Sequence, residues 1–311
     1  MDKRKIIDRK IIGPRSLNYL FSNKLDSPFR SFNNKKIYLW HDYHDIFYKQ
    51  KMGDKNKRIG IQYYIWNFVK MFTNSILYLE LPINIDQLNI QGHQMSLYAI
   101  YTESSNQTFK NIKYVDKRNR VSIGLLAEKL RHHYPIVEDD LKTLQEFTIK
   151  DVEYFIETYS KYLKEKCKDF KNKILLDTVI NYCMDELRKT DKINENILEK
   201  IKDLTVDNVN ESLKNKKTEN PIVYIEPIVA IIMDIYVILT MSITKNEHQI
   251  FYGGSAHSTM ISNILIKFGL ICKEVNELTI QKVEKFVEQN NEKNDTVNDE
   301  EDYDLSSLFE S

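Results

Sequence analysis

The sequence contains few cysteines and lacks the usual signals of an exported, disulfide-bonded protein. Among 311 residues there are only three cysteines, Cys167, Cys183 and Cys272, and no two of them form a CxxC pair. An odd number without paired spacing argues against a disulfide framework and against a structural zinc site. The N-terminus also lacks the apolar run of a signal peptide. We therefore expect an intracellular protein that folds in a reducing compartment.

The chain also lacks net charge, because 45 basic residues balance 45 acidic residues. A dedicated nucleic-acid-binding protein usually presents a basic surface, so nucleic acid is not an expected partner. The 19 Tyr and 14 Phe residues follow core-like periods and are not interleaved with Lys and Arg in one groove-like run. The balance is uneven along the chain. Residues 1–36 carry ten basic and three acidic side chains, and residues 287–311 carry nine acidic and one basic.

One long apolar stretch, residues 221–243, has the length of a membrane span but not its composition. Glu226, Pro227 and Asp234 interrupt it. A carboxylate near the centre of a bilayer costs a few kcal/mol. Sufficient length alone therefore does not make this segment a membrane span. We interpret the segment from about 227 to 243 as a buried helix and expect no membrane span.

Strand and helix patterns alternate at both ends of the chain. Apolar runs that are rich in β-branched and aromatic residues predict strands at residues 36–40, 75–81, 112–116 and 248–254, and a short last strand at 270–274. Apolar residues at helical spacing predict helices that begin near Ile61, Val121 and Ser255. This alternation predicts an α/β fold with a mostly parallel central sheet flanked by helices.

The whole chain is predicted to divide into three segments. Residues 1–35 are predicted to form a basic, irregular N-terminal arm, because Pro14 and Pro28 break any period. The α/β domain spans residues 36–286, with a helical insertion at about 140–218 whose outer faces are charged. Residues 287–311 are predicted to form an acidic, disordered tail. That tail either docks on a protein partner by folding on binding or only increases solubility.

Ionisable side chains stand near the carboxyl end of each of the four main predicted strands. They are His44 after the first strand, Glu80 at the second, Asp116 and Arg118 after the third, and His257 after Gly253 and Gly254 at the fourth. In open α/β sheets, ligands bind beyond the carboxyl ends of the strands. The sequence therefore predicts one functional site at that edge of the sheet.

Two imidazoles and one carboxylate at such an edge are compatible with two kinds of chemistry. His44, Glu80 and His257 can hold a divalent metal ion with an open position for water, or a carboxylate can orient a histidine that acts as general base. The chain has neither an HExxH helix nor a GxSxG elbow, so a metal site requires tertiary contact and a serine nucleophile is not expected. The two glycines permit close approach of a ligand or only tight packing.

Each of these residues also has a purely structural interpretation. A histidine after a strand is often a hydrogen-bonded turn residue, and Glu80 can cap the end of a neighbouring helix. Asp116 and Arg118 can form a salt bridge that only stabilises a turn.

The motifs resemble a superfamily that contains the erythromycin esterases, the TraB proteins, the haem-binding ChaN proteins and the Wnt-cleaving TIKI proteases. Its hallmarks match IYLWHDYH, which ends at His44, LYLELP, which contains Glu80, and GSAH, which ends at His257. His41 stands where the pattern has a glycine. The VDxR element with Asp116 and Arg118 also resembles divergent proteins of large DNA viruses.

The resemblance implies a hydrolase-like protein that acts on a small molecule or a peptide. In the TIKI branch, His and Glu surround a divalent ion, whereas the esterase branch is metal-free and a histidine activates water. His44, Glu80 and His257 would carry these roles, Arg118 would hold a negative substrate group, and Asp116 would position Arg118. The alternative is a catalytically inactive interaction or virion-associated protein that retains the fold, which fits the replaced glycine, the large helical middle and the charged ends.

Overall fold

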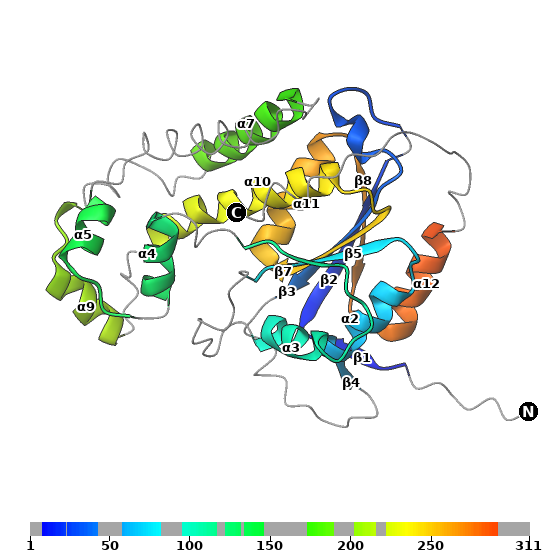
Figure 1. Cartoon of the computed structure of the whole chain (residues 1–311), viewed down its shortest axis with the longest axis horizontal. Coiled ribbons are helices and arrows are strands. Elements are labelled where there is room, and N and C mark those ends of the chain that lie inside the picture. Colours follow the sequence, from blue (N-terminus) through cyan, green and yellow to red (C-terminus); the bar gives the residue numbers. More distant parts are fainter. Residues whose placement is uncertain are drawn as a thin grey trace, which may run out of the picture. The chain divides into compact units, whose positions relative to one another are not determined.

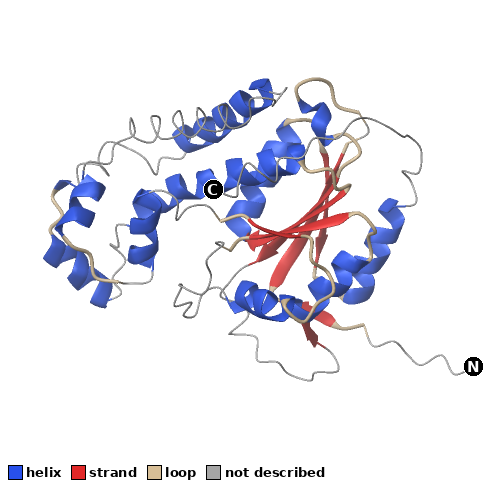
Figure 2. Ribbon diagram, viewed as in Figure 1, coloured by secondary structure: helices blue, strands red, loops and turns tan. Residues whose placement is uncertain are grey.

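A computed structural model shows how the chain folds (Figures 1 and 2). The structure describes residues 8–22, 24–42, 58–81, 95–116, 122–131, 134–145, 173–189, 202–215 and 222–291. These residues divide into two compact units. The first contains the described residues up to Val115 and those from Met241 onward, and the second contains those between Asp116 and Thr240.

The first unit is built around a six-stranded sheet. Its strands are β2 (Pro14–Phe21), β3 (Lys36–Asp42), β5 (Ser75–Leu79), β6 (Ile112–Tyr114), β7 (His248–Gly254) and β8 (Ile271–Asn276). Their order across the sheet is β6-β5-β7-β3-β2-β8. The pairs that β2 forms with β3 and β8 are antiparallel and the other three pairs are parallel, so the predicted α/β fold with a mostly parallel central sheet is confirmed. Two short strands, β1 (Lys10–Ile12) and β4 (Arg58–Gly60), form a separate parallel pair.

Helices cover both faces of this sheet (Figure 2). One face carries α2 (Ile61–Lys70), α3 (Met95–Ser104) and α12 (Ile280–Asn291), whose apolar side chains share one buried cluster with the strands. The opposite face carries α11 (Ser255–Lys267), which packs against β3, β7 and β2. Because both faces are covered, β3, β5 and β7 consist entirely of buried residues, as parallel strands in the middle of such a sheet usually do.

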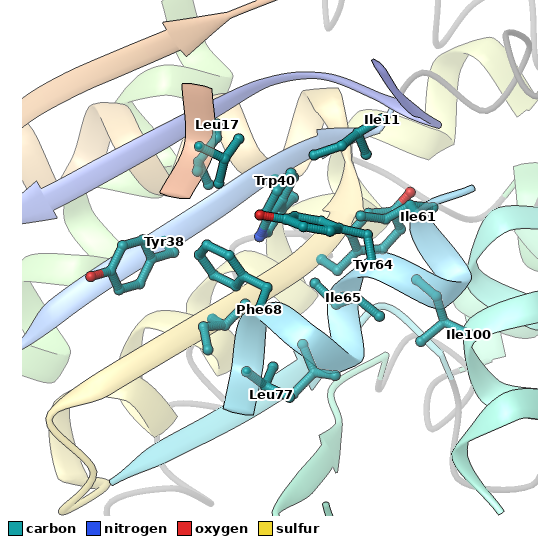
Figure 3. Packing of buried hydrophobic residues seen from close by; sticks show 14 of the residues in the cluster. Ile11, Leu17, Tyr38, Trp40, Ile61, Tyr64, Ile65, Phe68, Leu77 and Ile100 are labelled. Carbon is teal, nitrogen blue, oxygen red and sulfur yellow. The ribbon is translucent and has the colours of Figure 1, made fainter. Parts of the chain in front are cut away.

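Aromatic residues dominate the core on the α2 face (Figure 3). Trp40 of β3 meets Phe68 of α2 edge to face, with ring centroids 5.1 Å apart, and Phe68 meets Tyr38 in the same way at 5.4 Å. All three side chains are almost fully buried. Burial of a large apolar side chain contributes about 1.5–3 kcal/mol, and edge-to-face aromatic pairs add roughly 0.5–1.5 kcal/mol each. These aromatic contacts hold α2 against the sheet, and the helix in turn holds β3 and β5 in place.

The second unit is helical and has its own core. It contains α4 (Ser122–Arg131), α5 (Glu138–Gln145), α7 (Lys173–Lys189), α9 (Val206–Asn215) and most of α10 (Ile222–Ile243). Leucine and valine side chains from α4, α5, α9 and α10 form one buried cluster. The predicted helix at about 227–243 is therefore present, α7 lies within the predicted insertion, and the helical region is wider than the predicted 140–218. Among the described residues, no helix is long and apolar enough to cross a membrane.

Two of the predicted boundaries are wrong. The N-terminal segment is not an irregular arm, because β2 lies between β3 and β8 inside the sheet. Pro14 is tolerated because it is the first residue of that strand, where a missing amide hydrogen interrupts the ladder least. The acidic tail does not begin at residue 287, because α12 continues to Asn291 and Val287 packs into the core. The remainder of the predicted tail lies outside the described residues.

Candidate functional site at the carboxyl ends of the strands

The neighbouring strands β3 and β7 mark the point where the chain changes direction across the sheet. After β3 the chain continues to α2 on one face and then to β5, whereas after β7 it continues to α11 on the other face and then to β8. The two strands are in register to their ends, where Asp42 lies beside Gly254. Such a topological switch point is the usual place for a ligand site in an open α/β sheet. The structure therefore favours the edge of the sheet that the sequence predicted.

Glu80 and His257 meet at this edge. Glu80 follows β5 and is 3% exposed, and His257 lies in the first turn of α11 and is 6% exposed. The Glu80 Oε1 atom is 3.4 Å from His257 Nε2. Glu80 Oε2 accepts a hydrogen bond of 2.5 Å from the backbone N–H of Gly254. A carboxylate oxygen thus faces an imidazole nitrogen, an arrangement that can orient a general base and stabilise its protonated form.

The two glycines of β7 make room for this carboxylate. A Cβ atom on Gly253 would lie 2.9 Å from Glu80 Oε2 and 2.5 Å from Cζ of Phe251, closer than real Cβ contacts. Gly253 therefore allows both side chains to lie over the strand. Gly254 supplies the donor and precedes the first residue of α11, so Glu80 also places negative charge at a helix N-terminus.

A second buried carboxylate lies on the opposite face of the same edge. Asp42, the last residue of β3, is 1% exposed and accepts a hydrogen bond from Ser96 Oγ in the first turn of α3. The hydroxyl of Tyr252 is buried on this face, and burial followed by the charge of Asp42 raises the Tyr252 pKa well above its ordinary value. Tyr252 is thus a neutral phenol, and Asp42 holds the start of α3 against the sheet.

The other predicted site residues are distributed differently. His44 and Arg118 lie outside the described residues, so their predicted roles stay predictions. Asp116 is buried two residues after the end of β6, but it belongs to the second compact unit. Within the described ranges, no group of three or more His, Cys, Asp or Glu side chains could hold a metal ion. The described part of the predicted metal site therefore consists of Glu80 and His257 alone.

An open cavity of about 590 Å³ lies elsewhere along the carboxyl edge, beyond β8. Its lining consists of charged and polar side chains, Asp8, Lys10, Glu277, Thr279, Gln281, Lys282 and Lys285. Asp8 already satisfies the N-terminus of α12, because it accepts hydrogen bonds from Thr279 Oγ1 at 2.7 Å and from the N–H of Gln281 at 3.0 Å. We place the candidate site at Glu80 and His257 and not at this cavity, because the buried ionisable pair lies at the switch point.

Sequence patterns missed two parts of this edge. Ser96 and α3 fall in a segment without a clear helical period, so nothing there indicated a partner for Asp42. His41 was noticed in the sequence only as the residue that replaces a glycine of the first motif, although it is a buried residue of β3.

Comparison of the whole chain with family models, curated proteins and solved structures finds no match.

Proposed function

We propose that the protein is a hydrolase-like enzyme in which His257 acts as general base and Glu80 orients it. One observation carries this proposal, namely the buried contact of 3.4 Å between Glu80 Oε1 and His257 Nε2 at the topological switch point. Free enzymes often hold such pairs at the long end of hydrogen-bond distance and tighten them when substrate binds. The resemblance to erythromycin esterases and their relatives supports the same reaction class.

The proposed chemistry is hydrolysis of a carbonyl compound, an ester or an amide of a small molecule or peptide. A water oxygen attacks the carbonyl carbon while its proton moves to the imidazole of His257. The carbon–leaving group bond then breaks, and the same proton moves to the leaving group. Glu80 does not accept the proton, and its negative charge stabilises the imidazolium between these two steps. The hydrogen bond from Gly254 holds the carboxylate in place during both steps.

The His257→Gln variant tests this mechanism most directly. An amide at this position can still donate a hydrogen bond to Glu80 but cannot accept a proton from water. Against a panel of p-nitrophenyl esters and chromogenic amides, we expect turnover to fall roughly 10²-fold, at the lower end of what a general base contributes. The melting temperature should change by only a few degrees, roughly the effect of 1 kcal/mol on a chain of this size. Equal turnover by wild type and variant would remove the proposal.

A metal-dependent mechanism is the second candidate, and it uses the same residues. His44, Glu80 and His257 would be the protein ligands, and a bound divalent ion would supply an acidic water molecule. One oxygen of Glu80 already accepts a hydrogen bond from the N–H of Gly254, which leaves a single oxygen of this carboxylate for a metal ion. We therefore prefer the metal-free mechanism.

Metal removal separates the two mechanisms. We expect dialysis against EDTA to leave turnover within about twofold of the untreated enzyme, because proton transfer by His257 requires no ion. Elemental analysis of the purified protein before and after dialysis is the matching measurement. Activity that disappears with a stoichiometric metal, and returns when the metal is added back, would establish the metal-dependent mechanism instead.

The catalytically inactive alternative is favoured by one specific observation. Glu80 lies at the N-terminus of α11, and Asp42 lies at the first turn of α3, so each carboxylate also fastens a helix to the sheet. A protein that retained only its architecture would still need both groups. In that case the charged ends of the chain would carry the function by binding a protein partner.

A further inference from the structure

The sheet places a third ionisable side chain beside the Glu80–His257 pair. His41 of β3 is the register partner of Gly253 of β7. Leu79 of β5 is the register partner of Tyr252, so the next residue, Glu80, lies beside Gly253. Register partners in a sheet point to the same face, and successive residues alternate between faces. Glu80, Gly253 and His41 therefore form one row across three strands, on the face that α11 covers.

The His41 imidazole is buried, and its Nε2 atom lacks a hydrogen-bond partner among the described residues. The residue is 7% exposed. Burial lowers the pKa of His41 below its ordinary value, although Glu274 of β8 partly opposes this effect, so the ring is neutral at pH 7. A buried polar atom without a partner costs roughly 1–3 kcal/mol. Other buried atoms of the described core share this state, but His41 lies in the same row as Glu80, where a ligand could supply the missing partner.

His248 provides an internal comparison, because it is equally buried at the other end of the same sheet. It is 8% exposed and also has an unpartnered ring nitrogen, Nδ1. Its ring, however, stacks on Phe72 at a centroid distance of 4.2 Å and lies 3.6 Å from a carboxylate oxygen of Glu247. His248 is therefore a packing residue. Among the described residues no aromatic ring stacks on His41 in this way, so packing does not explain it.

We propose that His41 is a second functional imidazole of the site, with Nε2 reserved for the carbonyl oxygen of a bound ester or amide. This inference rests on the proposed hydrolase function. In the tautomer that carries hydrogen on Nε2, the neutral ring donates a hydrogen bond that strengthens as negative charge develops on the substrate oxygen. His41 gives up no proton, so the proton balance through His257 is unchanged.

Acylation by diethyl pyrocarbonate tests the accessibility of Nε2 without a known substrate. The reagent attacks neutral imidazoles that small molecules can reach, and peptide mass spectrometry reports each histidine separately. We expect His41 in the folded protein to react at least tenfold faster than His248, its match in burial. Equally slow reaction of the two residues would show that His41 is a core histidine and would overturn the proposal.

Kinetics of two His41 variants test its role in the reaction. We expect His41→Leu to lower kcat roughly 10²-fold with little change in KM, the typical loss for one donor to a developing oxyanion. His41→Gln, which restores an N–H donor, should recover most of that loss. Full activity of His41→Leu beside an inactive His257→Gln would reject the His41 role and leave the proposed function intact. Full activity of His257→Gln would reject both.

Discussion

The Glu80→Ala variant is expected to lose hydrolysis and to unfold with a free energy about 3 kcal/mol lower than that of the wild type. Removal of this side chain leaves the N–H of Gly254 and the imidazole of His257 without the carboxylate that both face in a buried site. Breaking a buried pair by deleting one partner typically costs about 3–5 kcal/mol, and an orphaned donor alone costs about 1–3 kcal/mol. Urea unfolding measures this loss, and the ester panel measures turnover.

The Glu80→Gln variant separates the two roles of the residue. Its amide oxygen can still accept from Gly254, so we expect most of the stability to remain. The neutral amide cannot stabilise an imidazolium, so turnover should fall by a factor on the order of 10². Glu288→Gln serves as the matched control, because that carboxylate is exposed on α12 and far along the chain from the pair. A Glu80→Gln protein with unchanged turnover would support the inactive alternative.

Glu80 therefore decides between an enzyme and a retained scaffold. Helix anchoring requires only an acceptor at the N-terminus of α11, and a glutamine or an aspartate of suitable reach provides one. General-base catalysis requires a negative charge beside His257. The same reasoning applies to Asp42, which accepts a hydrogen bond from Ser96 on the opposite face and so anchors α3. Because Glu80 faces the imidazole of His257, we assign the chemistry to the α11 face of the edge.

The strands that could be predicted were those with continuous apolar runs. Residues 36–40 and 248–254 consist of side chains that are buried on both faces, and their ends at ionisable or glycine residues were visible in the sequence. Since parallel strands end at the same edge, the pattern predicted that Glu80 and His257 lie at one edge of the sheet, but not that their strands are neighbours. The contact of 3.4 Å between them agrees with that prediction.

The features that could not be predicted depend on strand order. β2 was missed because its two faces contact different layers, so apolar and polar residues do not alternate, and a proline begins it. In the order β6-β5-β7-β3-β2-β8, the strand before Glu80 is the neighbour of the strand that ends at Gly254. The same order places His41 on the next strand, in one row with Glu80. No local pattern encodes which strands are neighbours, because the pairing depends on how helices of both faces pack. His41 therefore became visible as a site residue only through the register.

Acidification is expected to destabilise the fold through His248, at the opposite end of the sheet from the candidate site. Burial, followed by the charge of Lys36, lowers the His248 pKa to about 4, although Glu247 acts in the opposite direction. In the unfolded chain the pKa is about 6.5. Between these two values the unfolded state binds a proton that the folded state excludes. The free energy of unfolding should therefore fall by about 3 kcal/mol as the pH decreases from 6.5 to 4, with no further loss from this residue below pH 4.

The His248→Phe variant isolates this contribution, because a phenyl ring can keep the stacking on Phe72 but does not titrate. Other groups, including His41 and the surface carboxylates, contribute equally to the pH dependence of both proteins. Urea unfolding at pH 7 and at pH 4.5 should therefore show a smaller loss in the variant, by about 2–3 kcal/mol. An identical loss in both proteins would mean that the pocket hydrates or rearranges to accept the charged imidazole. The amino end of the sheet would then be more open than the stacked ring indicates, and His248 could no longer serve as the inaccessible reference for His41.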